Sequence, residues 1–495
     1  MAWADHLAQI QGFLVRGYTM LLVRHFALSV SNPEAARRIL GAMADGTGAF
    51  QVTSAAPWGA VKPQYCLSAG FTYGGLKALG VPAATLAGFA TPDHQPFVDG
   101  AAKRAPFVGD IGASAPGNWV LDDSEFDVLL SLYVNDPDTL DRLSRQLEQV
   151  LLDGFVAPAR NRIFDTQVYR DGQVYFGYED GIGQPILAGS PFSSEPDGGQ
   201  DLVDPGAFML GTATGPYYAS VPVPQPARFG QFGCFAAFRV LRQDVEGFEK
   251  QIDDLAPAVG KAFGISDSQP QLQRDAVKAK ICGRWPNGTS LSVFPIQGDT
   301  PPPLLPPQKI NDFLYLDEAG KPDKGQGCPI GSHARRGNMR LASAGDINPA
   351  FPGAPTRDHR IMRRAMPYQL PYDSNNPDDP TSERGLAGFF LGTSLMEQWE
   401  FVQHNWINNP NGFYIVIDPA DPLMGDAGSV AMYETAPTDT KPPGRNYKIR
   451  PMANFVFTKA SAYIFFPGLD GIRFVAGDLT PASKAPPQRP REARG

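Results

Sequence analysis

The sequence predicts an α+β fold in which two halves repeat one unit, an antiparallel sheet with helices packed on one side. Three observations support this prediction. A strand-like run followed at once by a capped amphipathic helix recurs along the chain. Gly 52 and Pro 48 together make about a fifth of the residues, which indicates many turns rather than a helical bundle. A length of 495 residues suits two large domains with long loops.

The N-terminal half contains the unit twice. Residues 18–30 are rich in β-branched, aromatic and aliphatic side chains, which predicts a strand. Asn32 suits a helix N-cap, and the proline after it suits the first helical position. The same order returns at residues 127–134 and Asp136, and residues 65–73 are a further strand candidate between the two units. The pattern predicts a split βαβ arrangement.

The C-terminal half begins in the same way. Residues 232–241 predict a strand, Asp244 a cap, and the apolar positions after it a helix. Residues 388–395 resemble a strand that leads into another helix, and residues 455–466 predict a final strand. The economical interpretation is a second half of split βαβ type.

Domain bounds follow from this repetition. We predict an N-terminal domain over residues 1–215, a C-terminal domain over residues 216–477 and a disordered tail over residues 478–495. Two irregular segments, 300–307 and 343–384, are longer than most loops in compact domains. We predict that both are ordered loops that line a functional site.

The charge of the chain argues against a nucleic-acid partner. Lys+Arg 43 against Asp+Glu 51 give a formal net charge of −8, which repels an anionic polymer. No apolar run approaches the roughly 18 residues of a membrane span, and the sequence starts without a secretory signal. The cysteines form no CxxC pair, so neither a disulfide framework nor a structural zinc site is indicated. We expect no membrane partner and cytoplasmic residence by default, with another export route left open.

One histidine lies beside a cluster of cations. His333 is followed by Arg335, Arg336 and Arg340, so a possible metal-ligating imidazole accompanies groups that bind carboxylates. A haem needs both, because its iron takes an axial nitrogen and its two propionates attract cations. The alternative is a solvated basic loop with an incidental histidine.

Two further segments hold candidate polar residues. Asp180 lies in a GxxDG element whose glycines permit tight turns and close approach of another group, although an Asp-Gly pair is also an ordinary turn signal. Arg363 and Arg364 lie in a mixed apolar and basic run, so at least one guanidinium is expected to turn inward. A buried ion pair that holds a loop is the alternative.

Glu400 falls within an apolar helical stretch. A carboxylate in such a place is paired with a positive group or is neutral. A ligand histidine is an apt partner, because a metal-bound imidazole donates its second N–H to a carboxylate or carbonyl.

Taken together, these motifs resemble the dye-decolourising peroxidase family. The resemblance covers most of the chain and rests on several motifs in the right order. They are the segments 97–119, 176–185, 283–288, the CPxxxH block at 328–340, 362–368 and 383–409. Independent motifs in one order are far more specific than any single motif.

The resemblance implies a haem b enzyme with one haem per chain and two ferredoxin-like domains of the dimeric α/β-barrel type. It implies that His333 is the proximal iron ligand and that Asp180 is the distal acid–base residue. Arg363 corresponds to the distal arginine and Arg340 to a propionate partner. Arg335 is expected to be a further cofactor contact because it belongs to the arginine cluster beside His333.

Glu400 corresponds by the same resemblance to the acid behind His333, with Glu397 as its rival by helical phase. Family members often have Leu-Leu-Phe after the Arg-Gly pair, whereas this sequence has Leu386, Ala387 and Gly388. If that phenylalanine narrows the distal side, Gly388 opens it.

The implied activity is reduction of hydrogen peroxide and one-electron oxidation of dyes, phenolics and other small aromatic donors by a monomer or homodimer. Two alternatives stay open. The first is a haem carrier or storage protein without significant turnover, and the second is a haem-free scaffold that kept the fold. The presence of both Asp180 and Arg363 favours the peroxidase, because a carrier has no need of a distal acid–base pair.

Overall fold

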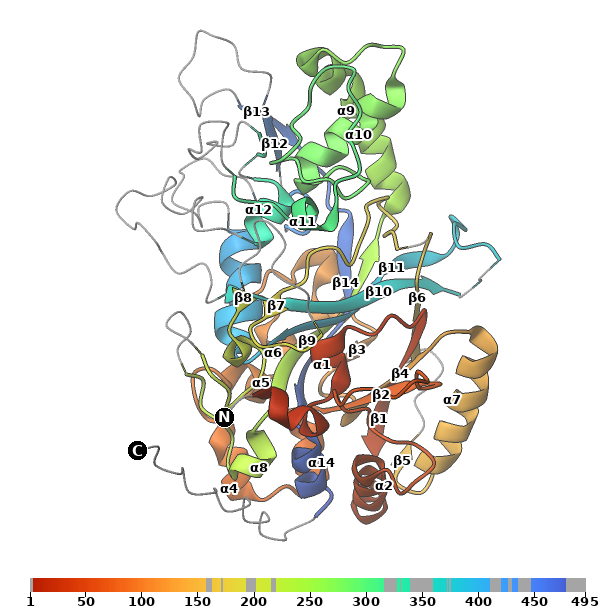
Figure 1. Ribbon diagram of the computed structural model, residues 1–495, viewed down its shortest axis with the longest axis vertical. Helices are drawn as coiled ribbons and strands as arrows, with labels where there is room; N and C mark the ends of the chain where they lie inside the picture. Colours follow the sequence, from red (N-terminus) through yellow and green to blue (C-terminus); the bar gives the residue numbers. More distant parts are fainter. Residues whose placement is uncertain are drawn as a thin grey trace, which may run out of the picture.

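Both halves of the chain contribute strands to one sheet (Figure 1). The computed structural model describes residues 3–156, 163–170, 172–192, 202–214, 220–315, 327–329, 331–338, 359–371, 373, 375–409, 420–425, 430–434 and 447–477. The predicted tail, 478–495, lies outside these residues.

Four long strands come from each half. The N-terminal strands are β1 (Leu22–Val30), β2 (Cys66–Phe71), β4 (Val128–Val134) and β6 (Ile163–Gln167). The C-terminal strands are β9 (Cys234–Gln243), β10 (Met362–Leu370), β11 (Glu383–Gly392) and β14 (Val456–Phe466). Short strands are β3 (Leu121–Asp122), β5 (Phe155–Val156), β7 (Ile186–Leu187), β8 (Leu202–Val203), β12 (Val430–Glu434) and β13 (Tyr447–Pro451).

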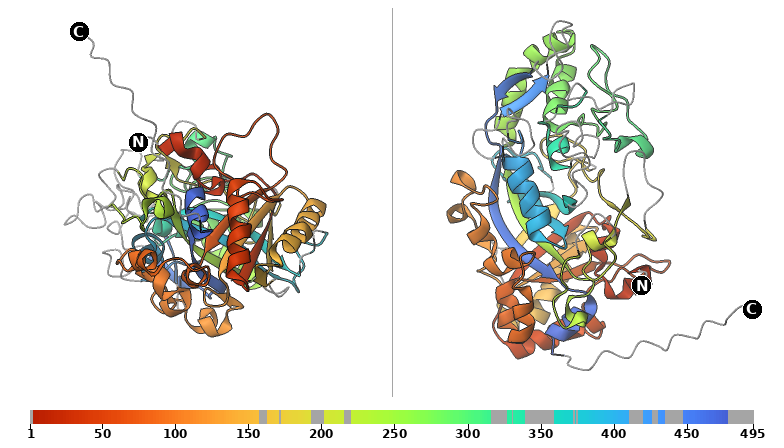
Figure 2. Two further views of the ribbon diagram at one scale, coloured as in Figure 1. Left: turned by 90° about the horizontal axis from the view of Figure 1, so that it is seen from below. Right: turned by 90° about the vertical axis from the view of Figure 1, so that its left-hand side faces the viewer.

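Helices cover the outer faces of this sheet (Figures 1 and 2). The longer ones are α2 (Pro33–Asp45), α7 (Pro137–Leu151), α9 (Val245–Phe263) and α10 (Pro270–Cys282). The π-helical segments Leu395–Glu400 and Val402–Asn408 form one further helical rod. Shorter helices are α1 (Gly12–Arg16), α3 (Tyr73–Ala78), α4 (Ala83–Leu86), α5 (Gln95–Asp99), α6 (Ala101–Arg104), α8 (Ala227–Gly230), α11 (Pro307–Ile310), α12 (His333–Gly337) and α14 (Leu469–Val475).

The predicted caps are confirmed. The side chain of Asn32 accepts a hydrogen bond from the backbone N–H of Ala35 at 3.2 Å, where α2 begins. Asp136 caps α7 and Asp244 caps α9 in the same way. These bonds satisfy backbone donors that no helical carbonyl can reach. The helix of each repeated unit therefore begins where the sequence predicts, whereas β1 begins at Leu22, four residues after the predicted start.

The two halves have the same strand order. The N-terminal strands lie in the order β2-β4-β1-β6, and the C-terminal strands in the order β10-β11-β9-β14. Strand β6 meets β10, and β14 pairs with β2, so the path closes on itself as a barrel. The α+β prediction with antiparallel pairing is confirmed. The halves share one closed sheet, because each covers the exposed strand edges of the other.

Strand β10 corrects one prediction. The sequence predicts a loop over residues 343–384, but Met362–Leu370 pairs with β11 along its whole length. Its two adjacent arginines and Pro367 hide the alternation that marks a strand. Residues 343–358 of the predicted loop lie outside the described residues.

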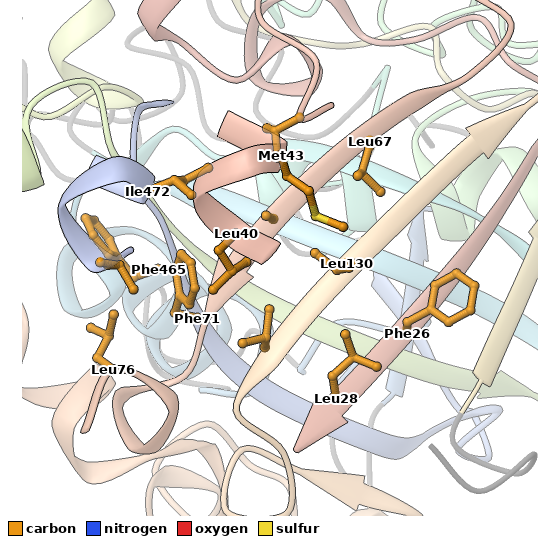
Figure 3. Packing of buried hydrophobic residues seen from close by; sticks show 14 of the residues in the cluster. Phe26, Leu28, Leu40, Met43, Leu67, Phe71, Leu76, Leu130, Phe465 and Ile472 are labelled. Atoms are coloured by element: carbon orange, nitrogen blue, oxygen red, sulfur yellow. The ribbon is translucent and has the colours of Figure 1, made fainter. Parts of the chain in front are cut away.

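Apolar residues pack on both faces of the sheet. On the outer face, Phe26, Leu67 and Leu130 belong to one hydrophobic cluster with Leu40 and Met43 of α2 (Figure 3). Inside the barrel, alternate strand residues form a second cluster, which includes Val23, Phe164, Phe238, Phe389 and Phe466. Successive side chains of a strand point to opposite faces, so each strand supplies both clusters. Among the described helices, none is long and apolar enough to cross a membrane.

A buried ion pair ties the segment after α6 to the barrel. Asp110 binds Arg239 of β9 through two bonds of 2.5 and 2.6 Å, and the two side chains are 5% and 3% exposed. Arg239 also donates to Thr458 and Ser461 of β14. All these partners come from elements that are distant in the sequence.

We predict that Asp110→Asn lowers the free energy of unfolding by about 3 kcal/mol, because it leaves the buried guanidinium of Arg239 without its counter-charge. Urea denaturation followed by circular dichroism measures this. The control is Glu34→Gln, which removes an exposed pair with Arg38 and should cost less than about 0.5 kcal/mol. Equal losses in the two variants would contradict the prediction.

Candidate functional site

A cavity of about 650 Å³ lies against β10, β11 and the helical rod 395–408. Three of the predicted site residues line it, namely Asp180, His333 and Arg363. They come from a loop, from the start of α12 and from β10, so the barrel brings together segments far apart in the sequence. Residues 180 and 333 therefore line one common cavity.

A buried carboxylate holds the ring of His333. Its Nδ1 lies 2.8 Å from Oδ2 of Asp421, which is 0% exposed. The other carboxylate oxygen accepts the backbone N–H groups of Leu423 and Met424 at 2.8 and 2.9 Å. Burial opposes ionisation of Asp421, but the charge and hydrogen bond of His333 and the two N–H groups together lower its pKa. Since Nδ1 is engaged, Nε2 is the ring nitrogen that can bind a metal.

Asp421 replaces the predicted partner, so the assignment of Glu400 to His333 was wrong. Glu400 is 0% exposed and accepts two bonds from Arg104, at 2.9 and 2.5 Å, and one from Tyr463 at 2.8 Å. Arg104 satisfies the charge of Glu400, so no histidine is needed. The side chain of the rival Glu397 is exposed.

The sequence carries only a weak signal for Asp421. An aspartate before Pro422 is a turn signal, and its side chain does accept the N–H groups two and three residues on. Nothing in that pattern indicates a distant histidine. A turn aspartate that is fully buried must find a positive or hydrogen-bonding partner, but burial is not visible in the sequence.

Arg335 also differs from its prediction. It is 2% exposed, donates to the carbonyl of Cys328 at 2.6 Å and stacks over the ring of Tyr315 at 4.2 Å. It is not among the described residues that line the cavity. We correct its role to support of the segment that carries His333. Arg340 lies outside the described residues.

Hydrogen bonds on both sides of Asp180 hold the loop that carries it. Lys278 of α10 donates to the carbonyl of Phe176 at 3.1 Å, and Tyr178 donates its hydroxyl proton to the carbonyl of Lys278 at 3.0 Å. Asn311 donates to the carbonyl of Ile182 at 2.9 Å. The backbone on both sides of Asp180 is therefore fixed, while its exposed side chain faces the cavity.

Arg363 joins β10 to the same loop. Its Nη2 donates to the carbonyl of Gly183 at 3.1 Å, and its backbone N–H donates to Gln184 at 3.1 Å. The residue is exposed within the cavity. A guanidinium has five N–H donors, so Arg363 can hold the loop and still donate to a bound molecule.

Gly388 of β11 lines the cavity opposite Ala365 of β10. Its φ is +155°, and an added Cβ would lie 2.2 Å from the carbonyl oxygen of Arg364. Close approach of the two strands therefore excludes any side chain here. Whether this glycine widens access to the cavity stays a prediction.

The side chains that line the cavity fit a metal ion that is already coordinated by a cofactor. Among the described residues, no group of three or more His, Cys, Asp or Glu side chains gathers to hold a bare ion. The cavity instead offers the single imidazole of His333, between apolar side chains such as Val402 and Ile407. Haem iron has four porphyrin nitrogens and needs an axial ligand of this kind.

Similarity to known proteins supports this assignment. The chain is 27% identical over 436 residues to dye-decolorizing peroxidase msp1 of Mycetinis scorodonius, covering 84% of this chain and 77% of that protein. It is 30% identical over 331 residues to the dye-decolorizing peroxidase of Mycena epipterygia, covering 62% and 58%. No family model matches the chain.

Solved structures show the same fold. A DyP-type peroxidase from Auricularia auricula-judae superposes with a TM-score of 0.75 at 22% identity, covering 95% of this chain and 99% of that one. Sequence similarity and fold therefore agree over nearly the whole chain. On this basis the chain is similar in sequence and in fold to dye-decolorizing peroxidases, which are oxidoreductases that act on peroxide.

Proposed function

We propose that this chain binds one haem b, reduces hydrogen peroxide with the help of Asp180 and Arg363, and oxidises dyes, phenolics and other small aromatic donors one electron at a time. The observation that carries the proposal is the common cavity. On one side lies the imidazole of His333, which is hydrogen-bonded to a buried carboxylate. The cavity also contains Asp180, which lies on a loop, and Arg363, which donates a hydrogen bond to that loop.

His333 is the residue proposed to hold the haem iron, through Nε2. When bound, haem takes up the two oxidising equivalents of peroxide and returns them singly to donors. Asp421 accepts the Nδ1–H, which fixes the tautomer and plane of the ring and makes Nε2 a stronger electron donor. Because Asp421 is fixed in turn by two backbone N–H groups, the ring has little freedom to rotate.

Asp180 is proposed to move one proton. Its carboxylate would accept the proton of the peroxide oxygen on the haem side. It would deliver that proton to the other peroxide oxygen, which leaves as water. Arg363 donates N–H groups to the charge that develops on the leaving oxygen. The shared loop supports this pairing, because Arg363 is bonded to Gly183 only three residues after Asp180.

We propose further that the halves are ferredoxin-like domains over residues 1–215 and 216–477. In support, each half places its second, third, first and fourth long strands side by side in that order. The helix between the first and second strands, and the one after the third, repeat as well.

We predict that Asp180→Asn keeps its haem but reacts with peroxide about 10²–10⁴-fold more slowly, because the proton carrier is lost. Soret absorbance per protein gives the haem content, and stopped-flow mixing with peroxide gives the rate constant. Glu179→Gln is the control, since Glu179 also lines the cavity and is given no proton to carry. If the Asp180 variant reacts as fast as wild type, the proposed shuttle is wrong.

A second prediction separates Asp421 from Glu400. Asp421→Asn should lower haem affinity or activity about 10–100-fold, because the histidine loses its carboxylate partner. Glu400→Gln should instead cost about 3 kcal/mol of unfolding free energy, because Arg104 loses its buried partner. Haem titration of the apoprotein and urea denaturation measure the two quantities. The reverse pattern would restore Glu400 as the partner of His333.

A third prediction distinguishes a peroxidase from a haem carrier without turnover. His333→Ala should lose or scramble iron coordination, seen as a changed Soret band. Wild-type protein that binds haem but turns over no peroxide with a phenolic donor would support the carrier function and reject the peroxidase.

A further inference from the structure

The cavity has a region that the proposed peroxide chemistry does not use. Successive side chains of a strand point to opposite faces, so Arg363 and Arg364 of β10 diverge. Arg363 meets the loop of Asp180, whereas Arg364 meets α1 at the barrel interior, beside Phe13. Both arginines line the cavity.

Arg364 has only neutral partners. Its Nε donates to the carbonyl of Phe13 at 2.8 Å, its Nη2 to the carbonyl of Leu14 at 3.2 Å and its Nη1 to the carbonyl of Arg363 at 3.1 Å. No carboxylate pairs with it in the described part of the chain. Burial lowers its pKa to about 10, so the group stays cationic at neutral pH and its charge is uncompensated.

Arg364 lines the cavity together with Gly17, Tyr18 and Tyr133. An added Cβ at Gly17 would lie 3.4 Å from Cζ of Arg364, in van der Waals contact with the guanidinium. The rings of Tyr18 and Tyr133 have centroids 5.0 Å apart. A cation in a cavity wall that also contains aromatic rings suits a flat anion.

The charges around the cavity favour an anion. Its lining includes five arginines, against the two acids Glu179 and Asp180. Among these arginines Arg239 is neutralised by Asp110, and Arg284 donates to Asn311 and to two carbonyls. Arg364 therefore combines a charge without a carboxylate partner among the described residues, a place in the cavity wall and aromatic residues in the same wall.

We propose that Arg364, with Gly17, Tyr18 and Tyr133, forms a subsite for the carboxylate of an aromatic acid. Phenolic acids are then the electron donors that the enzyme prefers, an extension that rests on the proposed peroxidase function. Each donor gives up one electron and its phenolic proton to become a phenoxyl radical. Two donors together reduce one hydrogen peroxide to two waters.

The test compares an acid with its neutral analogue. Calorimetric titration of the haem-loaded protein, without peroxide, should show benzoate binding about tenfold or more tightly than benzamide, because only benzoate makes a charge-assisted bond. Arg364→Gln keeps two N–H donors for the carbonyls of α1 but loses the charge, and should reduce the preference below about threefold. Arg363→Gln is the matched control and should keep the preference.

A second variant tests the subsite in case Arg364→Gln does not fold. Gly17→Ala places a methyl group against the guanidinium without changing any charge, and should also abolish the preference. Equal binding of benzoate and benzamide to wild type, or a preference that is lost in Arg363→Gln and kept in the other variants, overturns the subsite.

Steady-state kinetics separate this inference from the proposed function. The kcat/KM ratio of vanillate to vanillamide should fall about tenfold in Arg364→Gln. Benzoate preference in a protein without peroxide turnover would reject the peroxidase and keep the subsite. Turnover of both donors with no preference in wild type would keep the peroxidase and reject the subsite.

Discussion

The bond between His333 and Asp421 is the contact on which the site depends. A fully buried carboxylate is costly unless its charge is matched, and Asp421 is matched by one imidazole and two backbone N–H groups. Each partner satisfies part of the same charge, so the ring of His333 has one favourable orientation. That orientation leaves Nε2 as the ring nitrogen outside this bond, and the proposed ligation of haem iron uses that atom.

The opposite side of the cavity uses a different kind of constraint. The loop with Asp180 packs through Phe176 and Tyr178 in an apolar cluster, and Lys278, Asn311 and Arg363 also donate hydrogen bonds to its backbone carbonyls. Because neutral carbonyls accept these hydrogen bonds, the carboxylate of Asp180 takes no part in them. The result is a rigid backbone with a reactive side chain that remains available, which general acid–base catalysis requires.

Sequence patterns predicted local structure better than they predicted long-range pairing. The caps at Asn32 and Asp136 depend on neighbours three residues away, and both were predicted. The partners of buried charges depend on the closed barrel, so Glu400 was assigned to the wrong cation and Asp421 was missed. Strand β10 was missed because adjacent arginines on opposite faces do not alternate in polarity, although each points to a different environment.

Gly388 has a consequence for redesign of this pocket. Because the backbone of β10 already occupies the space of a Cβ at this position, even an alanine there must push two hydrogen-bonded strands apart. Any mutant library that varies position 388 would report on inter-strand spacing rather than on pocket width. Leu386 and Phe390 point into the same cavity from the same strand, and they are the positions at which its shape can be tuned without moving the backbone.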